Sequence, residues 1–175
     1  GSKGHMGDMP GFDLIVQGYT GAVASEGKIT KNGQPEVVWS SSYIDFSTGY
    51  AAANGILAGI IGRGKTGKGQ LVSTSLLANA IAMQSLRISD VEGIPSPAKT
   101  WFEQTRPGLI ERGASYEEIQ DSYQITVRPL IYRCYYRAYK TLDGGLALGT
   151  LAVHARARLL DVFGLKDPRV TDPSY

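Results

Sequence analysis

The stretch of residues 45–62, which reads DFSTGYAAANGILAGIIG, most constrains how this chain can fold. Four small residues in it lie three or four positions apart, the spacing that places side chains on one face of an α-helix: Gly49, Ala52, Gly55 and Gly59. We predict a helix that has Asp45 as its N-cap and runs through Gly62. A face of small residues lets another backbone approach closely. The sequence therefore predicts a long helix against which a second segment packs.

Composition and charge exclude several classes of protein. Glycine accounts for 22 of the 175 residues, and 18 basic against 16 acidic residues leave a formal net charge of +2. This charge is too small to predict an electrostatic interaction with nucleic acid or with an anionic membrane. The longest small and apolar stretch, residues 50–61, is shorter than the roughly 20 residues that a bilayer-spanning helix needs. We therefore expect neither nucleic acid nor a membrane among the partners.

Cysteine and histidine usage favours a reducing compartment and argues against a metal site. Cys134 is the only cysteine, so it forms no disulfide within the chain. No set of Cys and His residues has zinc-ligand spacing. Residues 1–6 resemble a cloning scar, which removes His5 from consideration and leaves His154. We expect a cytoplasmic protein with no bound metal and no chemistry that needs two imidazoles.

Hydrophobic periodicity predicts further helices. Residues 12–19 have Phe12, Ile15, Val16 and Tyr19 on one face, and residues 76–86 and 152–163 are also predicted to be helical. Ser115 and Glu118 have the spacing of a capping box, which predicts another short helix after them.

Alternating patterns predict strands, and the chain as a whole is predicted to be α+β. Residues 70–74, 132–141 and 146–151 alternate, and Asp143–Gly144 between the last two supplies a hairpin turn. The segment 93–107 contains Pro95, Pro97 and Pro107, so we predict a linker without regular structure there.

The residues Gly59–Thr66 satisfy the pattern G-x-x-x-x-G-K-[ST] of a phosphate-binding loop. Such a loop must leave a strand and open a helix, so that backbone N–H groups point at the phosphates. Here a helix is predicted before the loop and a strand after it. We therefore interpret the stretch as a basic turn without a nucleotide.

Three other candidates have structural interpretations. His154 shares a predicted helix face with Arg158 and Asp161, which indicates a solvent-exposed position, and Cys134 is predicted to be a buried thiol. Basic and aromatic side chains alternate at four positions, as they do in proteins that bind single-stranded nucleic acid: Arg133, Tyr135, Arg137 and Tyr139. We interpret them as a sheet face covered by a partner segment rather than as a nucleic-acid site.

Asp45 is the carboxylate that we select as a candidate catalytic group. As an N-cap it would accept hydrogen bonds from otherwise unpaired backbone N–H groups. The positive end of the helix dipole favours the charged carboxylate at the same position. Because an ionised carboxylate can attack an activated acyl group, the cap and the nucleophile are compatible roles.

Four motifs in this order resemble those of class III CoA-transferases, the family of formyl-CoA and carnitine CoA-transferases and of α-methylacyl-CoA racemase. They are Pro10–Gln17, Ile44–Gly49, Ile56–Arg63 and the pair Thr66–Gln70 with Ser73–Leu77. The resemblance implies a partial family fold: closing helices and a strand of a Rossmann-like large domain at residues 7–92, a crossover at 93–130, and the start of a smaller domain at 131–175.

The resemblance also implies an activity and its residues. Asp45 corresponds to the aspartate that attacks an acyl-CoA thioester and becomes an aspartyl-CoA thioester, from which CoA passes to an acceptor carboxylic acid. Pro10, Gly11, Phe12 and Asp13 correspond to a segment that lines the CoA site. CoA thioesters are substrates in this family, no cofactor is permanently bound, and the chains form homodimers.

Two departures from the family pattern refine this expectation. The racemase branch has a proton-carrying histidine where this chain has Phe12, which favours a transferase over a racemase. Family members are also considerably longer, so we expect the central portion of a family member with an incomplete CoA site. A non-catalytic binding or assembly module on the same scaffold remains the alternative, and the sequence leaves the acyl group and the acceptor acid open.

Overall fold

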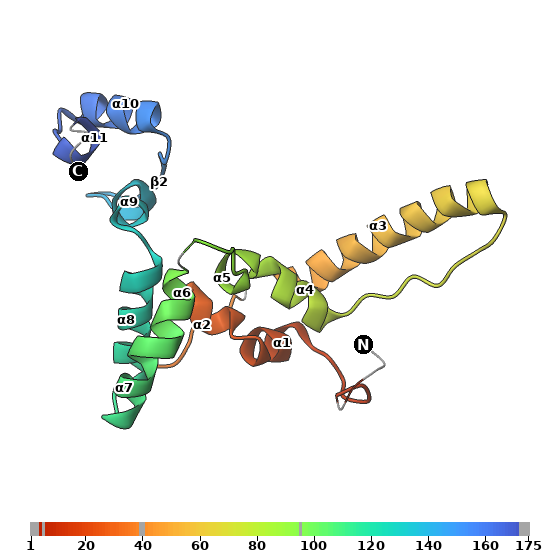
Figure 1. Ribbon diagram of the computed structural model, residues 1–175. Helices are drawn as coiled ribbons and strands as arrows, with labels where there is room; N and C mark the ends of the chain where they lie inside the picture. Colours follow the sequence, from red (N-terminus) through yellow and green to blue (C-terminus); the bar gives the residue numbers. More distant parts are fainter. Residues whose placement is uncertain (1–3, 5, 39–40, 95, 172–175) are drawn as a thin grey trace. The chain divides into compact units, whose positions relative to one another are not determined.

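The computed structural model describes residue 4 and residues 6–38, 41–94 and 96–171, which form two compact units, Gly1–Tyr123 and Gln124–Tyr175 (Figure 1). The first unit contains α1 (Asp13–Tyr19), α2 (Ala22–Glu26), α3 (Tyr43–Thr66), α4 (Leu76–Met83), α5 (Ser85–Ile88), α6 (Pro97–Thr100), the π-helix η1 (Trp101–Thr105), α7 (Arg106–Glu111) and most of α8 (Tyr116–Val127). The second unit contains α9 (Leu130–Tyr135), β1 (Tyr136–Lys140), β2 (Gly145–Gly149), α10 (Val153–Phe163) and α11 (Pro168–Thr171).

The long helix predicted from the spacing of small residues is α3, but both of its predicted ends are wrong. It begins at Tyr43 with Ser42 as N-cap, so Asp45 lies in the first turn and is not the cap. At the other end it continues through the predicted basic turn to Thr66, because Gly67 supplies the left-handed conformation, with φ 68°, that ends a helix. Arg63 and Lys65 in the last turn complement the negative end of the helix dipole.

The glycine face of α3 packs against the extended segment that follows it, as the small-residue spacing predicts. A Cβ added at Gly55 would lie 2.6 Å from Cγ1 of Val72, and one added at Gly59 would lie 3.3 Å from Nε2 of Gln70. Figure 1 shows this segment running back to α4. The prediction of a strand at 70–74 is wrong, because these residues are extended and belong to no sheet.

The start of α3 is anchored in a small core between three helices. Ile44 is fully buried and packs with Val16 of α1 and Ala80 of α4, with Tyr43 and Leu76 around them. The predicted apolar face of α1 is wrong in part. Val16 is buried, but Phe12, Ile15 and Tyr19 are exposed, and the other buried side chains of α1 are Asp13 and Gln17.

The prediction that prolines interrupt regular structure at 93–107 is wrong, because α6, η1 and α7 follow one another without a break. Pro97 lies in the first turn of α6, where a helix needs no N–H from it. Pro107 is the second residue of α7, in the first turn, where proline is also tolerated. Trp101 is buried here, and its indole N–H donates to Ser122 Oγ at 2.9 Å.

Of the two hydrogen bonds of the predicted capping box before α8, the one that the Ser115 side chain accepts is confirmed. The N–H of Glu118 donates to Ser115 Oγ at 3.1 Å. The Glu118 carboxylate pairs with Arg112.

In the second unit the predicted hairpin is confirmed, whereas its first strand is shorter than predicted. β1 and β2 form a two-stranded antiparallel sheet in which Tyr136 pairs with Gly149 and Lys140 with Gly145. Residues 130–135 are helical, so Arg133 and Tyr135 lie on α9 while Arg137 and Tyr139 lie on β1. The four residues therefore do not form the single strand face that we predicted. The final helix, α10, begins one residue after its predicted start.

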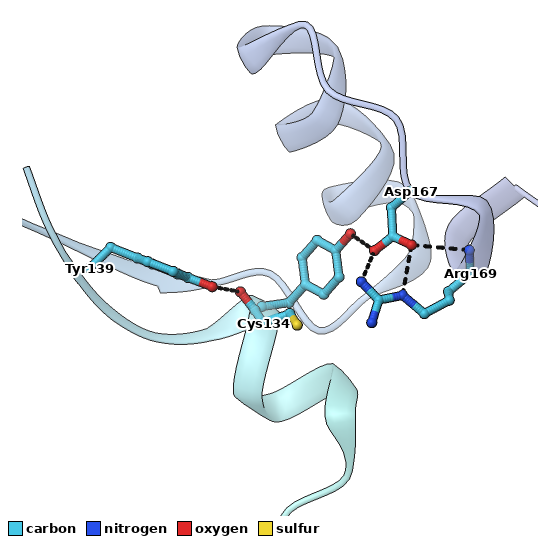
Figure 2. Close-up of polar contacts among 5 residues, drawn as sticks. Cys134, Tyr139, Asp167 and Arg169 are labelled. Carbon is cyan, nitrogen blue, oxygen red and sulfur yellow. Dashed lines mark hydrogen bonds and ion pairs between the residues drawn. The ribbon is translucent and has the colours of Figure 1, made fainter.

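A buried carboxylate links α9 to α11 (Figure 2). Asp167 accepts Nε of Arg169 at 2.7 Å and its Nη2 at 2.6 Å, and also accepts the Tyr135 hydroxyl at 2.6 Å. The hydrogen bonds from Arg169, and to a smaller extent the one from Tyr135, hold the pKa of Asp167 well below its usual range. Burial, followed by the bond to Asp167, raises the pKa of Tyr135 to about 12.

Replacing Asp167 by asparagine is expected to destabilise the second unit at neutral pH and to matter less in acid. Because the folded pKa of Asp167 is lowered, its contribution is complete above the unfolded pKa of about 4 and declines as the pH falls toward the folded value. We expect a cost of about 1–3 kcal/mol at pH 7. Urea unfolding of wild type and Asp167→Asn at a series of pH values measures it, and a gap that widens below pH of about 4 would contradict the assignment.

Candidate active site

Asp45 lies on the first turn of α3 with an exposed side chain. The preceding residue, Ile44, is fully buried in the core, so its packing holds the turn that carries Asp45 in place. An exposed carboxylate on the first turn of a helix is accessible to a substrate and lies at the positive end of the helix dipole. This arrangement can present a nucleophilic oxygen without a mobile loop.

The carboxylate of Asp13 on α1 binds the start of α3. Its Oδ2 accepts the backbone N–H of Ile44 at 2.8 Å and that of Asp45 at 3.1 Å. Its Oδ1 accepts the side-chain amide of Gln17, one turn further along α1. Asp13 and Gln17 are both buried. The structure therefore brings together two predicted site residues that are 32 positions apart, Asp13 and Asp45.

The four residues predicted to line the CoA site fall into two groups. Pro10, Gly11 and Phe12 are exposed, and Phe12 is 61% exposed in the extended conformation that precedes α1. Asp13 is buried, and both of its oxygens accept hydrogen bonds from the protein. Gln17 is a partner of Asp13 that we did not predict from the sequence, although the four-residue spacing of Asp13 and Gln17 on a helix is a signal for such a pair.

A cavity of about 430 Å³ adjoins the first turn of α3 on the side of Tyr43. Its lining includes charges of both signs, from Glu26, Lys28 and Arg87, and does not include Asp45. Burial is the main cause that raises the pKa of the Tyr43 phenol, and the negative charges of Glu26 and Asp13 add to it. The positive charge of Arg87 lowers this pKa, but by less. The phenol thus stays neutral at physiological pH, and the cavity is separate from the candidate nucleophile.

Comparison with protein families decides the assignment. The sequence model of the family described as CoA-transferase family III matches residues 1–175, the whole chain. The chain belongs to CoA-transferase family III. None of the curated proteins matches it.

Solved structures show that this family III chain has a known fold. The orthorhombic crystal form of Rv3272 from Mycobacterium tuberculosis is 20% identical, with a TM-score of 0.64 over 99% of this chain and 37% of that one. An aspartate-to-alanine mutant of Rv3272 is 18% identical, with a TM-score of 0.61 over 94% of this chain and 34% of that one. The predicted α+β fold of the family is confirmed, and the chain spans about a third of the length of these solved chains.

The other sequence candidates of this family III chain do not gather into a second site. His154 is exposed on α10, as predicted, and the predicted buried thiol Cys134 is only half-buried, at the edge of a largely apolar cavity of about 720 Å³ in the second unit. Across the described ranges, no three His, Cys, Asp or Glu residues lie close enough together to hold a metal ion. Within the same ranges no helix combines the length and apolar character needed to cross a bilayer.

We expect the family III chain to show no saturable binding of ATP or GTP with magnesium at concentrations up to about 1 mM. The pattern Gly59–Thr66 lies inside the last turns of α3, where the N–H groups are used by the helix and the helix end is negative. Isothermal calorimetry on wild type and Lys65→Ala measures it. A micromolar dissociation constant that is lost in Lys65→Ala would contradict this interpretation.

Proposed function

We propose that this family III chain is part of an acyl-CoA:carboxylate CoA-transferase in which Asp45 is the nucleophile. The observation that carries the proposal is the exposed Asp45 carboxylate on a helical turn that the core and Asp13 hold in place. The family match over the whole chain supports CoA thioesters and carboxylic acids as the substrates.

The proposed reaction uses one side chain twice. The Asp45 carboxylate attacks the acyl carbonyl of the thioester, the C–S bond breaks and CoA leaves as a thiolate, and a mixed anhydride of Asp45 and the donor acid remains. The thiolate attacks the carbonyl of Asp45, which releases the donor acid and forms the aspartyl-CoA thioester. The acceptor carboxylate then attacks this thioester, its C–S bond breaks, and CoA thiolate and a new mixed anhydride form. The thiolate attacks the acyl carbon of the acceptor in this anhydride, and the bond from that carbon to the Asp45 oxygen breaks. Product acyl-CoA leaves and the Asp45 carboxylate is regenerated.

Pro10, Gly11 and Phe12 are proposed to contact CoA, because they form an exposed run directly before α1, whose first residue binds the turn of Asp45. Phe12 carries no proton, so it cannot serve as an acid or base at the α-carbon of an acyl group. This supports transfer of CoA over racemisation of the acyl group. Solvent deuterium is therefore not expected to enter that carbon.

The remaining CoA contacts are proposed to come from other parts of a longer protein that acts in the cytoplasm as a homodimer. The solved chains that share this fold are nearly three times as long. Large apolar side chains on α3 are more than half exposed and offer a surface for such contacts: Phe46, Tyr50, Ile56, Leu57, Ile60 and Ile61.

The experiment that tests this function traps the covalent intermediate. The full-length protein is incubated with a series of acyl-CoA donors, quenched with hydroxylamine or borohydride, and digested for mass spectrometry. We expect the modification on the peptide that contains Asp45. A modification confined to another residue, or active transfer of CoA without any trapped protein adduct, would contradict the proposal.

A further inference from the structure

We propose that Asp13 is a positioning residue, which holds the first turn of α3 and thereby aims the Asp45 carboxylate, and that it does not itself contact CoA. This inference rests on the proposed role of Asp45. It differs from the role that the resemblance implies for Asp13, namely lining the CoA site.

The N-terminus of α3 lacks a cap of its own. The first N–H groups of a helix have no acceptor within the helix and need one from outside. Ser42 occupies the N-cap position, but its side chain forms no capping hydrogen bond. The N–H of Tyr43 donates to the Ser41 carbonyl at 2.8 Å, and those of Ile44 and Asp45 donate to Asp13. A carboxylate from α1 therefore replaces the local cap.

The bond to Asp45 is formed by the backbone of the proposed nucleophile itself. Since Oδ2 of Asp13 lies 3.1 Å from the N of Asp45, a shift of the first turn displaces the Cα and Cβ atoms that aim the reactive carboxylate. The other bond, to Ile44 at 2.8 Å, is buried and is joined to the packing of Ile44 on Val16 and Ala80. Position and direction of the turn are thus set together.

Gln17 in turn orients Asp13. Its side-chain amide donates to Oδ1 of Asp13, which leaves Oδ2 directed at α3. Gln17 is 1% exposed, and its Oε1 has no hydrogen-bond partner among the described residues. Both carboxylate oxygens of Asp13 thus accept hydrogen bonds from protein donors inside the core, so the carboxylate is not directed at a CoA molecule on the surface.

Two substitutions at Asp13 separate positioning from the other possible roles. Asp13→Ala removes the acceptor, and we expect the Asp45 adduct to form about 100-fold more slowly at saturating acyl-CoA, the scale expected when a reacting group is displaced. The acyl-CoA concentration for half-maximal rate should change less than about twofold, because no CoA contact is lost. Asp8→Ala, at an exposed aspartate before α1, is the matched control and should behave as wild type.

Asp13→Asn should restore most of the rate, to within about tenfold of wild type. Its carbonyl oxygen still accepts the two N–H groups, and its amide can donate to the unpartnered oxygen of Gln17 once the Gln17 amide is rotated. An acid–base role would instead leave Asp13→Asn as slow as Asp13→Ala, and a CoA-binding role would raise the half-saturation concentration. Either result would overturn the proposal.

Two further measurements keep the test decisive. If Asp13→Ala does not fold, Gln17→Met removes the donor that orients Asp13 and should slow adduct formation about tenfold at an unchanged half-saturation concentration; no effect on the rate would overturn the proposal. Hydrogen exchange of the Ile44 and Asp45 backbone amides does not depend on acyl-CoA or on formation of the adduct. It should be about tenfold faster in the Asp13 or Gln17 variant than in wild type and unchanged in Asp8→Ala. Unchanged exchange would refute the positioning role, whereas a wild-type protein without an adduct would refute only the proposed function.

Discussion

The full-length protein with Asp45→Asn is expected to form no covalent CoA adduct and to lose roughly 10⁴-fold or more in CoA-transfer rate, the scale seen when a catalytic carboxylate or nucleophile is removed. Asparagine has the shape of aspartate but an amide in place of the anionic oxygen that we propose attacks the thioester. Because Asp13 binds the backbone at this position and not the side chain, the first turn of α3 should keep its conformation. The rate of CoA exchange between donor and acceptor acids measures the effect, with mass spectrometry of the trapped protein alongside it.

Asp121→Asn is the matched control for this loss. It makes the same chemical change at an exposed aspartate on α8, away from the proposed chemistry, and should retain the wild-type rate. An Asp45→Asn protein that still forms the adduct would exclude Asp45 as nucleophile. Full loss of the rate in both variants would mean that the substitution acts through the fold.

Replacing Trp101 by alanine is expected to lower the free energy of unfolding of the first unit by about 3–5 kcal/mol. The indole is 2% exposed and lies edge-on to Tyr123, with 4.9 Å between the ring centroids, and to Phe102 at 5.2 Å. Its N–H donates to Ser122 Oγ. The substitution removes the largest buried apolar side chain that joins η1 to α8, and it leaves a cavity between them.

Denaturant unfolding followed by circular dichroism measures this effect without depending on tryptophan fluorescence. Phe102→Ala removes a neighbouring ring that is half exposed, so it should cost clearly less than Trp101→Ala. Trp101→Phe keeps an aromatic ring but loses the hydrogen bond, and an intermediate value is expected. A cost below about 1 kcal/mol for Trp101→Ala would contradict the assignment of this side chain as the centre of the contact.

The sequence predicts α3 correctly as an element and its ends incorrectly, for identifiable reasons. The spacing of small residues is a local signal, and it reaches from Gly49 to Gly59. The start of the helix depends on Asp13, which lies 32 positions before Asp45 in the chain, so no local pattern contains it. The end depends on Gly67, one of several glycines in that stretch that could each have ended the helix.

Alternation and proline content were the less reliable signals. The residues 132–135 alternate as in a strand, yet they follow Pro129, which opens a short helix in which Tyr135 is buried. Over so few residues, alternation fits a strand and a helix turn equally well. Pro97 and Pro107 are compatible with helices because each lies in the first turn of its element, a distinction that composition does not make.

At the candidate site, motif order led to Asp45, whereas the structural role of Asp13 could not be found in the same way. The groups that Asp13 binds are backbone N–H groups, which every residue except proline carries. The identity of the residues that donate them therefore gives no signal of this contact in the sequence. Its own identity and the glutamine four positions later were visible, but only the fold shows where they point.

This form of attachment has an evolutionary consequence. A carboxylate that binds backbone N–H groups forms the same hydrogen bonds whichever side chain those residues carry, proline excepted. The residue at position 45 could therefore be exchanged during divergence while the turn that presents it stays in register. A scaffold of this kind can acquire a new reactive group by a single codon change, and it can lose the old one without losing its shape.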